Sequence, residues 1–185
     1  LMTINLGRGP PVKGGLLLIS ADDPQGHSSQ NEQDNRILGM FAEIPTFEPS
    51  SPQEAKEMVL KAFDLSEEFR VPVMIRTVTR FNHMSSPVVL GKIRTAASET
   101  RFQREPRLPM LVHHKALHEK VRAIETFFEG ISFNSIEQGE DAVGIIAAGF
   151  TYNYVKEAIS LLGLGKKIGI LKIGTSFPLP RQMIK

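Results

Sequence analysis

Apolar residues follow two patterns along this chain, and the order of the two patterns predicts an α/β fold. Largely apolar runs, typical of strands buried on both faces of a parallel sheet, cover residues 16–20, 73–77, 143–148 and 168–173. Between these runs, apolar residues recur at helical spacing. Strands that alternate with helices through short links form βαβ units with right-handed crossovers, so we expect mainly parallel sheets.

The clearest helix signal begins at Ser50 and Ser51. Either serine offers an N-cap, and Pro52 suits the first turn of a helix. Glu54 adds a negative charge, which is favourable near a helix N-terminus. The apolar residues that then recur at helical spacing are Ala55, Met58, Val59, Ala62 and Phe69.

Three other apolar stripes predict further helices. The first stripe, over residues 31–42, ends before Pro45, and a short strand over residues 46–48 follows. The last stripe, over residues 152–162, is expected to point inward and ends at the glycines of residues 163–165. The stripes consist of Ile37, Leu38 and Phe41; of Leu117, Val121, Ile124 and Phe128; and of Val155, Ala158, Ile159 and Leu162.

A break in the pattern suggests two structural units. Between residues 79 and 107 the periodicity dissolves into Arg, Ser, Thr and Pro, with one extended piece over residues 88–90. An irregular linker of about 30–50 residues is uncommon inside one compact domain. We therefore expect parts of two α/β domains, in residues 1–90 and 142–185, joined by a linker over 91–141 that carries one amphipathic helix.

Composition is ordinary for a globular protein and excludes several classes. Of the 185 residues, 41% are hydrophobic and 23% are charged. No apolar run approaches the ~20 residues of a membrane helix, and the first fifteen residues lack the apolar segment of a signal peptide. A net charge of +2 without a basic, aromatic-rich stripe predicts neither nucleic-acid nor membrane binding.

The absence of cysteine excludes disulfides and thiolate-held zinc or iron–sulfur sites from this segment. It is also typical of a reducing compartment, so we expect a cytoplasmic protein. Because Leu1 precedes Met2 and no cap opens the first element, we expect the sequence to be an internal piece of a longer polypeptide.

A polar run over residues 21–35 directly follows the first strand and is the most informative chemical feature. It holds four Asp or Glu residues and one histidine, His27, which offers a proton shuttle or an orienting donor. Open α/β sheets bind ligands at the carboxyl ends of parallel strands, whereas a solvated turn would have a similar composition. No G-x-S-x-G elbow surrounds Ser28 or Ser29, so a Ser-His-Asp nucleophile is not expected.

Residues 76–80 (RTVTR) lie at the carboxyl end of another predicted strand. Two Arg and two Thr side chains at this place suit bidentate binding of a carboxylate or a phosphate. The alternative is that the arginines form salt bridges with the acidic loop after the first strand, or contact a partner chain. The residue types favour this alternative slightly.

Two other motifs are interpreted as structural. Residues 7–15 (GRGPPVKGG) match no phosphate-binding loop, and their prolines remove amide donors, so we predict a turn. His114 and His118 are four residues apart and would share a helix face, with His113 beside them. Because the sequence around them supplies neither the glutamate of a zinc-protease helix nor a third ligand, we expect a surface or helix-terminus cluster and no metal site.

Five blocks of this chain resemble the 2-oxoacid:ferredoxin oxidoreductase family, and within it the alpha subunits of the indolepyruvate branch. The most specific block is GGLLLISADDPQGHSSQNEQDNR, over residues 14–36. The others follow in family order over residues 48–59, 72–80, 144–159 and 171–180. The resemblance implies the later half of a thiamine-diphosphate pyrimidine-type domain, followed by the start of a transketolase C-terminal-like domain.

The same resemblance implies oxidative decarboxylation of a 2-oxoacid, with electrons passed to ferredoxin and the acyl group to coenzyme A. Thiamine diphosphate, magnesium and iron–sulfur clusters would serve the full complex, and none of them is expected to be fully bound by this segment. The implied partners are the beta subunit, ferredoxin, coenzyme A and the 2-oxoacid, in an oligomer. The alternatives are an enzyme for pyruvate or another 2-oxoacid, and a non-catalytic assembly module.

Candidate site residues follow from the resemblance. In this interpretation His27 is catalytic, and the RTVTR segment binds the substrate carboxylate or holds a subunit contact. In the alternative, the polar loop packs mainly at a dimer interface. The implied cofactor-binding residues are Asp22, Asp23, Ser28, Gln30 and Gln33, and the implied substrate-binding residues are Arg76, Thr77, Thr79 and Arg80.

Overall fold

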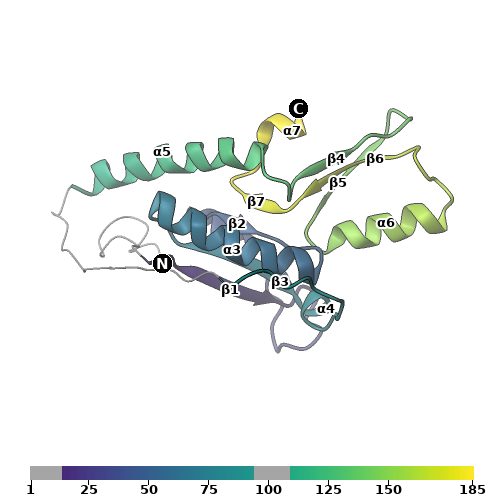
Figure 1. The fold of residues 1–185 in the computed structure, drawn as a ribbon, viewed down its shortest axis with the longest axis horizontal. Coiled ribbons are helices and arrows are strands. Elements are labelled where there is room, and N and C mark those ends of the chain that lie inside the picture. Colours follow the sequence, from purple (N-terminus) through teal and green to yellow (C-terminus); the bar gives the residue numbers. More distant parts are fainter. Residues whose placement is uncertain (1–13, 94–108) are drawn as a thin grey trace.

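The computed structural model describes residues 14–93 and 109–185, and within these ranges the chain forms two small sheets with helices packed beside them (Figure 1). The first sheet has the order β1 (Leu17–Asp22), β3 (Val73–Val78), β2 (Thr46–Phe47), β7 (Thr175–Phe177). The second has the order β4 (Ser135–Glu137), β6 (Gly169–Ile173), β5 (Gly144–Ala148). The helices are α2 (Arg36–Phe41), α3 (Pro52–Phe69), α4 (Thr79–Asn82), α5 (Met110–Glu129), α6 (Thr151–Leu161) and α7 (Arg181–Ile184).

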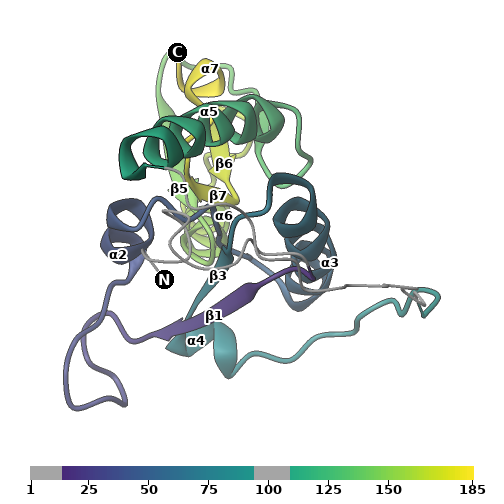
Figure 2. The same cartoon turned by 90° about the vertical axis from the view of Figure 1, so that its left-hand side faces the viewer.

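The first sheet is built from two crossovers that run in opposite directions. From β1 the chain passes through α2 to β2, and then returns through α3 to β3, which pairs in parallel with both β1 and β2. Right-handed crossovers in opposite directions place their helices on opposite faces of a sheet. Figure 2 shows α2 and α3 on opposite sides of β1 and β3. The carboxyl ends of all three strands therefore meet at one edge.

The predicted helix α3 is confirmed and supplies one side of the main core. Ser51 caps it, accepting a hydrogen bond at 3.2 Å from the backbone N–H of Glu54. Its buried apolar side chains pack with Phe47 of β2, whose ring meets that of Phe128 edge-on at a centroid distance of 5.2 Å. Because Phe128 belongs to α5, this helix shares the core of the first sheet. The core cluster includes Met58, Ala62, Leu65, Val73, Ile75, Leu117 and Ile124.

Two of the predicted apolar stripes, on α2 and α6, are wholly or partly exposed and do not face the core over their whole length. The stripe on α2 lies outward, with Ile37 and Phe41 each about two-thirds exposed at 66% and 67%. Gly39 faces the sheet instead, and a Cβ there would lie 2.6 Å from Cε of Met74, so the helix backbone approaches closely. This helix begins at residue 36, later than predicted, because the preceding residues form the polar loop.

The expectation that the whole stripe on α6 points inward is wrong for two of its four residues. Ile159 is buried and Val155 is half-buried, but Ala158 and Leu162 are exposed. The second sheet has only three strands, and therefore covers one narrow side of this helix.

Two short antiparallel strands were not predicted. β4 pairs with β6, and β7 pairs with β2, so the segment after β6 returns to the first sheet. The amide of Asn134 holds this return in place, since it donates to the Phe128 carbonyl at 2.8 Å and accepts from Gly174 N–H at 2.8 Å. The proposed division into domains at residues 90 and 142 stays a prediction.

Within the two described ranges, no helix combines the length and the apolar character needed to cross a bilayer. Most of the predicted turn over residues 7–15 lies outside the described residues, as do residues 94–108 of the predicted linker. Residues 88–90 have no regular secondary structure.

Replacing Asn134 by Leu should destabilise the chain by about 2–5 kcal/mol, because the carbonyl of Phe128 and the N–H of Gly174 would both lose their buried partner. Urea unfolding followed by circular dichroism measures the change. Asn82→Leu, at an exposed residue of α4, is the matched control. Equal midpoints for the two variants would contradict the role of Asn134.

Candidate functional site

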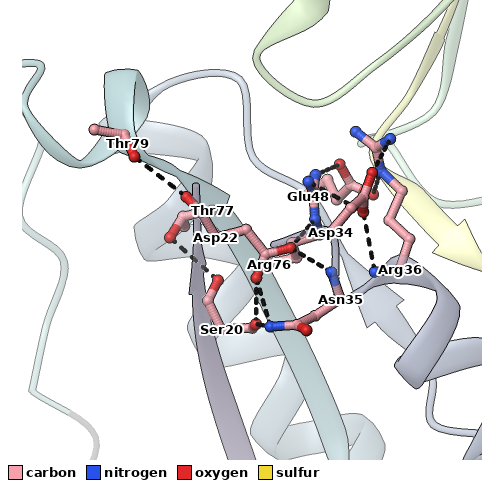
Figure 3. A network of polar contacts seen from close by, with 9 residues as sticks. All are labelled: Ser20, Asp22, Asp34, Asn35, Arg36, Glu48, Arg76, Thr77 and Thr79. Carbon is pink, nitrogen blue, oxygen red and sulfur yellow. Dashed lines mark hydrogen bonds and ion pairs between the residues drawn. The ribbon is translucent and has the colours of Figure 1, made fainter. Parts of the chain in front are cut away.

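A buried guanidinium lies at the carboxyl edge of the first sheet (Figure 3). Arg76 of β3 is 2% exposed, and its Nε donates to Asp22 Oδ2 at 2.6 Å. Its Nη1 donates to Glu48 Oε2 at 2.9 Å. Its Nη2 lies 3.2 Å from Asp34 Oδ1 but makes no hydrogen bond. Strands β1 and β3 and the residue after β2 thus meet around one charge.

The carboxylates around Arg76 are themselves held by neighbours. Asp22 accepts hydrogen bonds from the Asn35 backbone N–H at 2.6 Å and from its side-chain amide at 2.8 Å. Ser20 donates to the same carboxylate at 2.7 Å. Glu48 also accepts from Nε of Arg36 at 2.9 Å. These bonds pair the buried charges and tie the end of the polar loop to the sheet.

The start of the polar loop is organised by Asp23, which is 2% exposed. Its Oδ1 accepts from the Thr79 hydroxyl at 2.5 Å, and its Oδ2 accepts from the backbone N–H groups of Ser28 and Ser29, each at 2.6 Å. The Thr79 hydroxyl and then these two N–H groups hold the pKa of Asp23 well below its ordinary value of 3.8. The carboxylate therefore stays ionised, and its hydrogen bonds fix the first part of the loop.

A cleft of about 450 Å³ opens between this loop, the ends of β3 and β2, and the turn after β5. One wall is aromatic, because the rings of Phe81 and Phe150 lie 6.5 Å apart and those of Phe150 and Tyr154 lie 5.3 Å apart. The guanidinium of Arg80 lies 5.9 Å from the centre of the Tyr154 ring. Such a cleft at the carboxyl ends of parallel strands is where open α/β sheets bind ligands.

The predicted site residues divide into two groups. His27, Arg76, Thr77, Thr79 and Arg80 line the cleft. The lining does not include Asp22, Asp23, Ser28, Gln30 or Gln33.

The predicted site residues that do not line the cleft either bind other protein groups or are exposed to solvent. Asp22 and Asp23 hold Arg76 and the loop, and Ser28 contributes its backbone N–H to Asp23. Gln30 and Gln33 are exposed. For Arg76, the salt bridge to the acidic loop after the first strand, left open by the sequence, is present. The catalytic, cofactor-binding and substrate-binding roles of all these residues stay predictions.

Sequence reasoning missed Glu48, Phe150 and Tyr154. Glu48 follows a predicted short strand, and a carboxylate at that strand end was a usable signal. The two aromatic residues belong to the second α/β unit, and the sequence offers no sign that its β5–α6 turn meets the first sheet. Gly149 makes that meeting possible: its φ is +53°, and a Cβ there would lie 2.9 Å from Cβ of Glu48.

Comparison with known proteins identifies close relatives. Indolepyruvate oxidoreductase subunit IorA of Thermococcus kodakarensis is 45% identical over 188 residues, covering 95% of this chain and 29% of that subunit. The same subunit of Archaeoglobus fulgidus is 42% identical over 181 residues, covering 94% and 29%. The 2-oxoglutarate synthase subunit KorA of Methanothermobacter thermautotrophicus is 30% identical over 90 residues, covering 49% and 22%. The chain thus spans under a third of the length of these relatives.

A solved structure shares the fold. The 2-oxoglutarate:ferredoxin oxidoreductase from Magnetococcus marinus matches all of this chain and 40% of its own chain with a TM-score of 0.65, at 15% identity. No family model matches the chain. The family resemblance and the α/β fold expected from the sequence are confirmed.

Arg76→Met should destabilise the chain by about 3–5 kcal/mol, because it leaves Asp22 as a buried charge without its cation and Glu48 with Arg36 alone. Arg76→Lys should recover only part of this loss, since an ammonium cannot reproduce the planar guanidinium fork. Chemical denaturation gives both values, and Arg122→Met at an exposed residue of α5 is the control. A loss no larger than that of the control would mean that the network is not stabilising.

Asp23→Asn should lower stability by an amount that depends on pH. Because the folded pKa of Asp23 lies below 3.8, its contribution is complete above that value and is lost as the pH falls toward the folded pKa. The difference between wild type and variant in urea unfolding should therefore be constant from neutral pH down to about 5 and shrink only below 3.8. A difference that shrinks between pH 7 and 5 would contradict the lowered pKa.

Proposed function

We propose that this chain, which is homologous over nearly its whole length to a segment of the indolepyruvate oxidoreductase subunits, serves a 2-oxoacid:ferredoxin oxidoreductase. In this proposal the cleft at the carboxyl edge of the first sheet receives the 2-oxoacid. The reaction is oxidative decarboxylation, with electrons leaving to ferredoxin and the acyl group to coenzyme A. The observation that carries the proposal is the convergence of the family-specific loop and the RTVTR segment on one cleft.

Arg80 is the residue best suited to hold the substrate carboxylate. It is exposed, it lines the cleft, and no carboxylate among the described residues forms an ion pair with it. Arg76 lies deeper and is neutralised by Asp22 and Glu48, although its Nη2 has no hydrogen bond. An incoming carboxylate would therefore meet Arg80 first, with Arg76 behind it.

The shape and lining of the cleft favour an aromatic 2-oxoacid over pyruvate. Phe81, Phe150 and Tyr154 contribute aromatic rings to the lining, and His27 lies at the same cleft. A volume of about 450 Å³ leaves room for an indole ring beside the keto acid group. His27 is exposed and is proposed to orient or move a proton at the substrate oxygen.

The residues of this chain can be compared with what each cofactor of such an enzyme requires for binding. Thiamine diphosphate, when bound in the assembled enzyme, supplies the carbanion chemistry of decarboxylation. The chain itself does not fit an iron–sulfur cluster, since it has no cysteine. The cleft does not fit magnesium either, because Asp22, Asp34 and Glu48 already face Arg76 and Arg36. These groups are proposed to be held by other parts of the complex.

The partners proposed for this chain are the beta subunit and ferredoxin, in the cytoplasm. The exposed stripe of Ile37, Leu38 and Phe41 on α2 is a surface that another part of such a complex would cover. This stripe also supports the second candidate function, a non-catalytic assembly module. The two candidates differ in whether cleft residues affect turnover.

Arg80→Ala, introduced into the assembled oxidoreductase, should raise the KM for the 2-oxoacid by about 10–100-fold, the value of one charge-assisted hydrogen bond. The change in kcat should be small, because the carboxylate is held alike in ground state and transition state. Anaerobic reduction of a viologen acceptor with indolepyruvate, pyruvate or 2-oxoglutarate measures both constants.

Arg122→Ala, on the exposed face of α5, is the matched control and should leave KM unchanged. An unchanged KM in Arg80→Ala would remove the proposed carboxylate site. Absence of turnover on any 2-oxoacid in the wild-type complex would favour the assembly module instead.

A further inference from the structure

A second cluster of chemically active side chains lies away from the cleft. The Nε2 atom of His118 lies 2.7 Å from Glu43 Oε1, and that of His114 lies 3.1 Å from Glu43 Oε2. The two imidazole rings are 4.2 Å apart, centre to centre. One atom from each of the three residues can be chosen so that all three atoms lie within 4.8 Å of one another.

The three residues come from two separate parts of the chain. His114 and His118 are four residues apart on α5, which places them one turn above each other on the same face. Glu43 lies between α2 and β2, 71 residues before His114. The sequence suggested that a third ligand was lacking because only the fold brings Glu43 to this face.

The backbone at Glu43 is unusual for its residue type. Its φ is +55°, in the left-handed region that glycine and asparagine adopt at lower cost. A glutamate there is strained by about 1 kcal/mol, whereas glycine could end α2 at this position without that cost. The strained position directs a carboxylate toward the two imidazoles.

The donor set matches the preferences of zinc. Two imidazole nitrogens and one carboxylate oxygen, with a fourth position open, form a common zinc environment. At bond lengths of about 2.0–2.2 Å the ligand atoms of a tetrahedral site are about 3.4 Å apart. The contact of 2.7 Å between His118 and Glu43 would therefore open slightly, and separations of up to 4.8 Å would close by little more than 1 Å. The histidine side chains are 44% and 47% exposed and can move by that amount.

We propose that Glu43, His114 and His118 form a zinc-binding site that fastens the N-terminal half of α5 to the first sheet. Among the described side chains of this half, Leu111 is 80% exposed, and Leu117 is the first that joins the core cluster. Zinc would therefore stabilise a helix end that apolar packing leaves loose. The site is separate from the cleft and does not depend on the proposed enzymatic function.

The test is zinc binding to the chelator-treated protein, measured by titration calorimetry and by the visible absorption of Co²⁺ as a probe. One zinc ion per chain is expected, with a thermal midpoint that rises on zinc addition and falls again with chelator. His114→Ala and His118→Ala should each weaken zinc binding by about tenfold or more, because even loss of an outer-shell partner costs that much.

His113→Ala is the matched control, since it removes the neighbouring histidine of the same helix and leaves the three ligands intact. Glu43→Gln, which keeps the size of the side chain, should fold normally and lose most of the zinc-induced thermal shift. Absence of stoichiometric binding, or an equal loss in His113→Ala and His114→Ala, would overturn the proposal. In the first case the cluster would be a set of hydrogen bonds alone.

Discussion

The pairing of Arg76 with Asp22 and Glu48 is the interaction on which the arrangement of this chain depends. A guanidinium that is 2% exposed needs its charge balanced inside the protein. The balancing carboxylates belong to β1 and to the residue after β2, so the charge can be satisfied only when the three parallel strands end together. Asp34 and Arg36 extend the network into the polar loop, which is thereby fixed above the same edge.

This constraint separates residues that build the site from residues that are available to a ligand. The carboxylates of Asp22, Asp23 and Glu48 bind groups of the protein itself. Asp23 stays ionised because Thr79 and the loop N–H groups lower its pKa. Arg80 and His27 remain exposed at the cleft that these contacts create. The division explains how an acidic loop can border the cleft that is proposed to bind an anionic substrate.

The sequence predicted those helices and strands whose boundaries depend on signals within the element itself. Helix α3 has its cap, its proline and its stripe within twenty residues, and β3 and β5 are apolar runs. The pattern could not show that the stripe on α2 faces outward, because periodicity reports that a face is apolar and not what covers it. The strands β4 and β7 are three residues each, too short for a period to appear.

The candidate site was predictable to a similar degree. The polar loop and the RTVTR segment could each be placed at the carboxyl end of a predicted parallel strand, whereas the part played by Glu48 and Tyr154 depends on contacts between distant segments. The close fit of Gly149 against Glu48, which brings the β5–α6 turn to the cleft, is likewise a property of the folded chain.

The most direct test of this account is a crystal structure of the assembled oxidoreductase with a non-reactive 2-oxoacid analogue. The account predicts that the analogue lies in the cleft, with its carboxylate at Arg80 and its side chain against Phe150 and Tyr154, while Arg76 keeps its bonds to Asp22 and Glu48. A cleft filled by side chains of another subunit, with the analogue bound elsewhere, would contradict it.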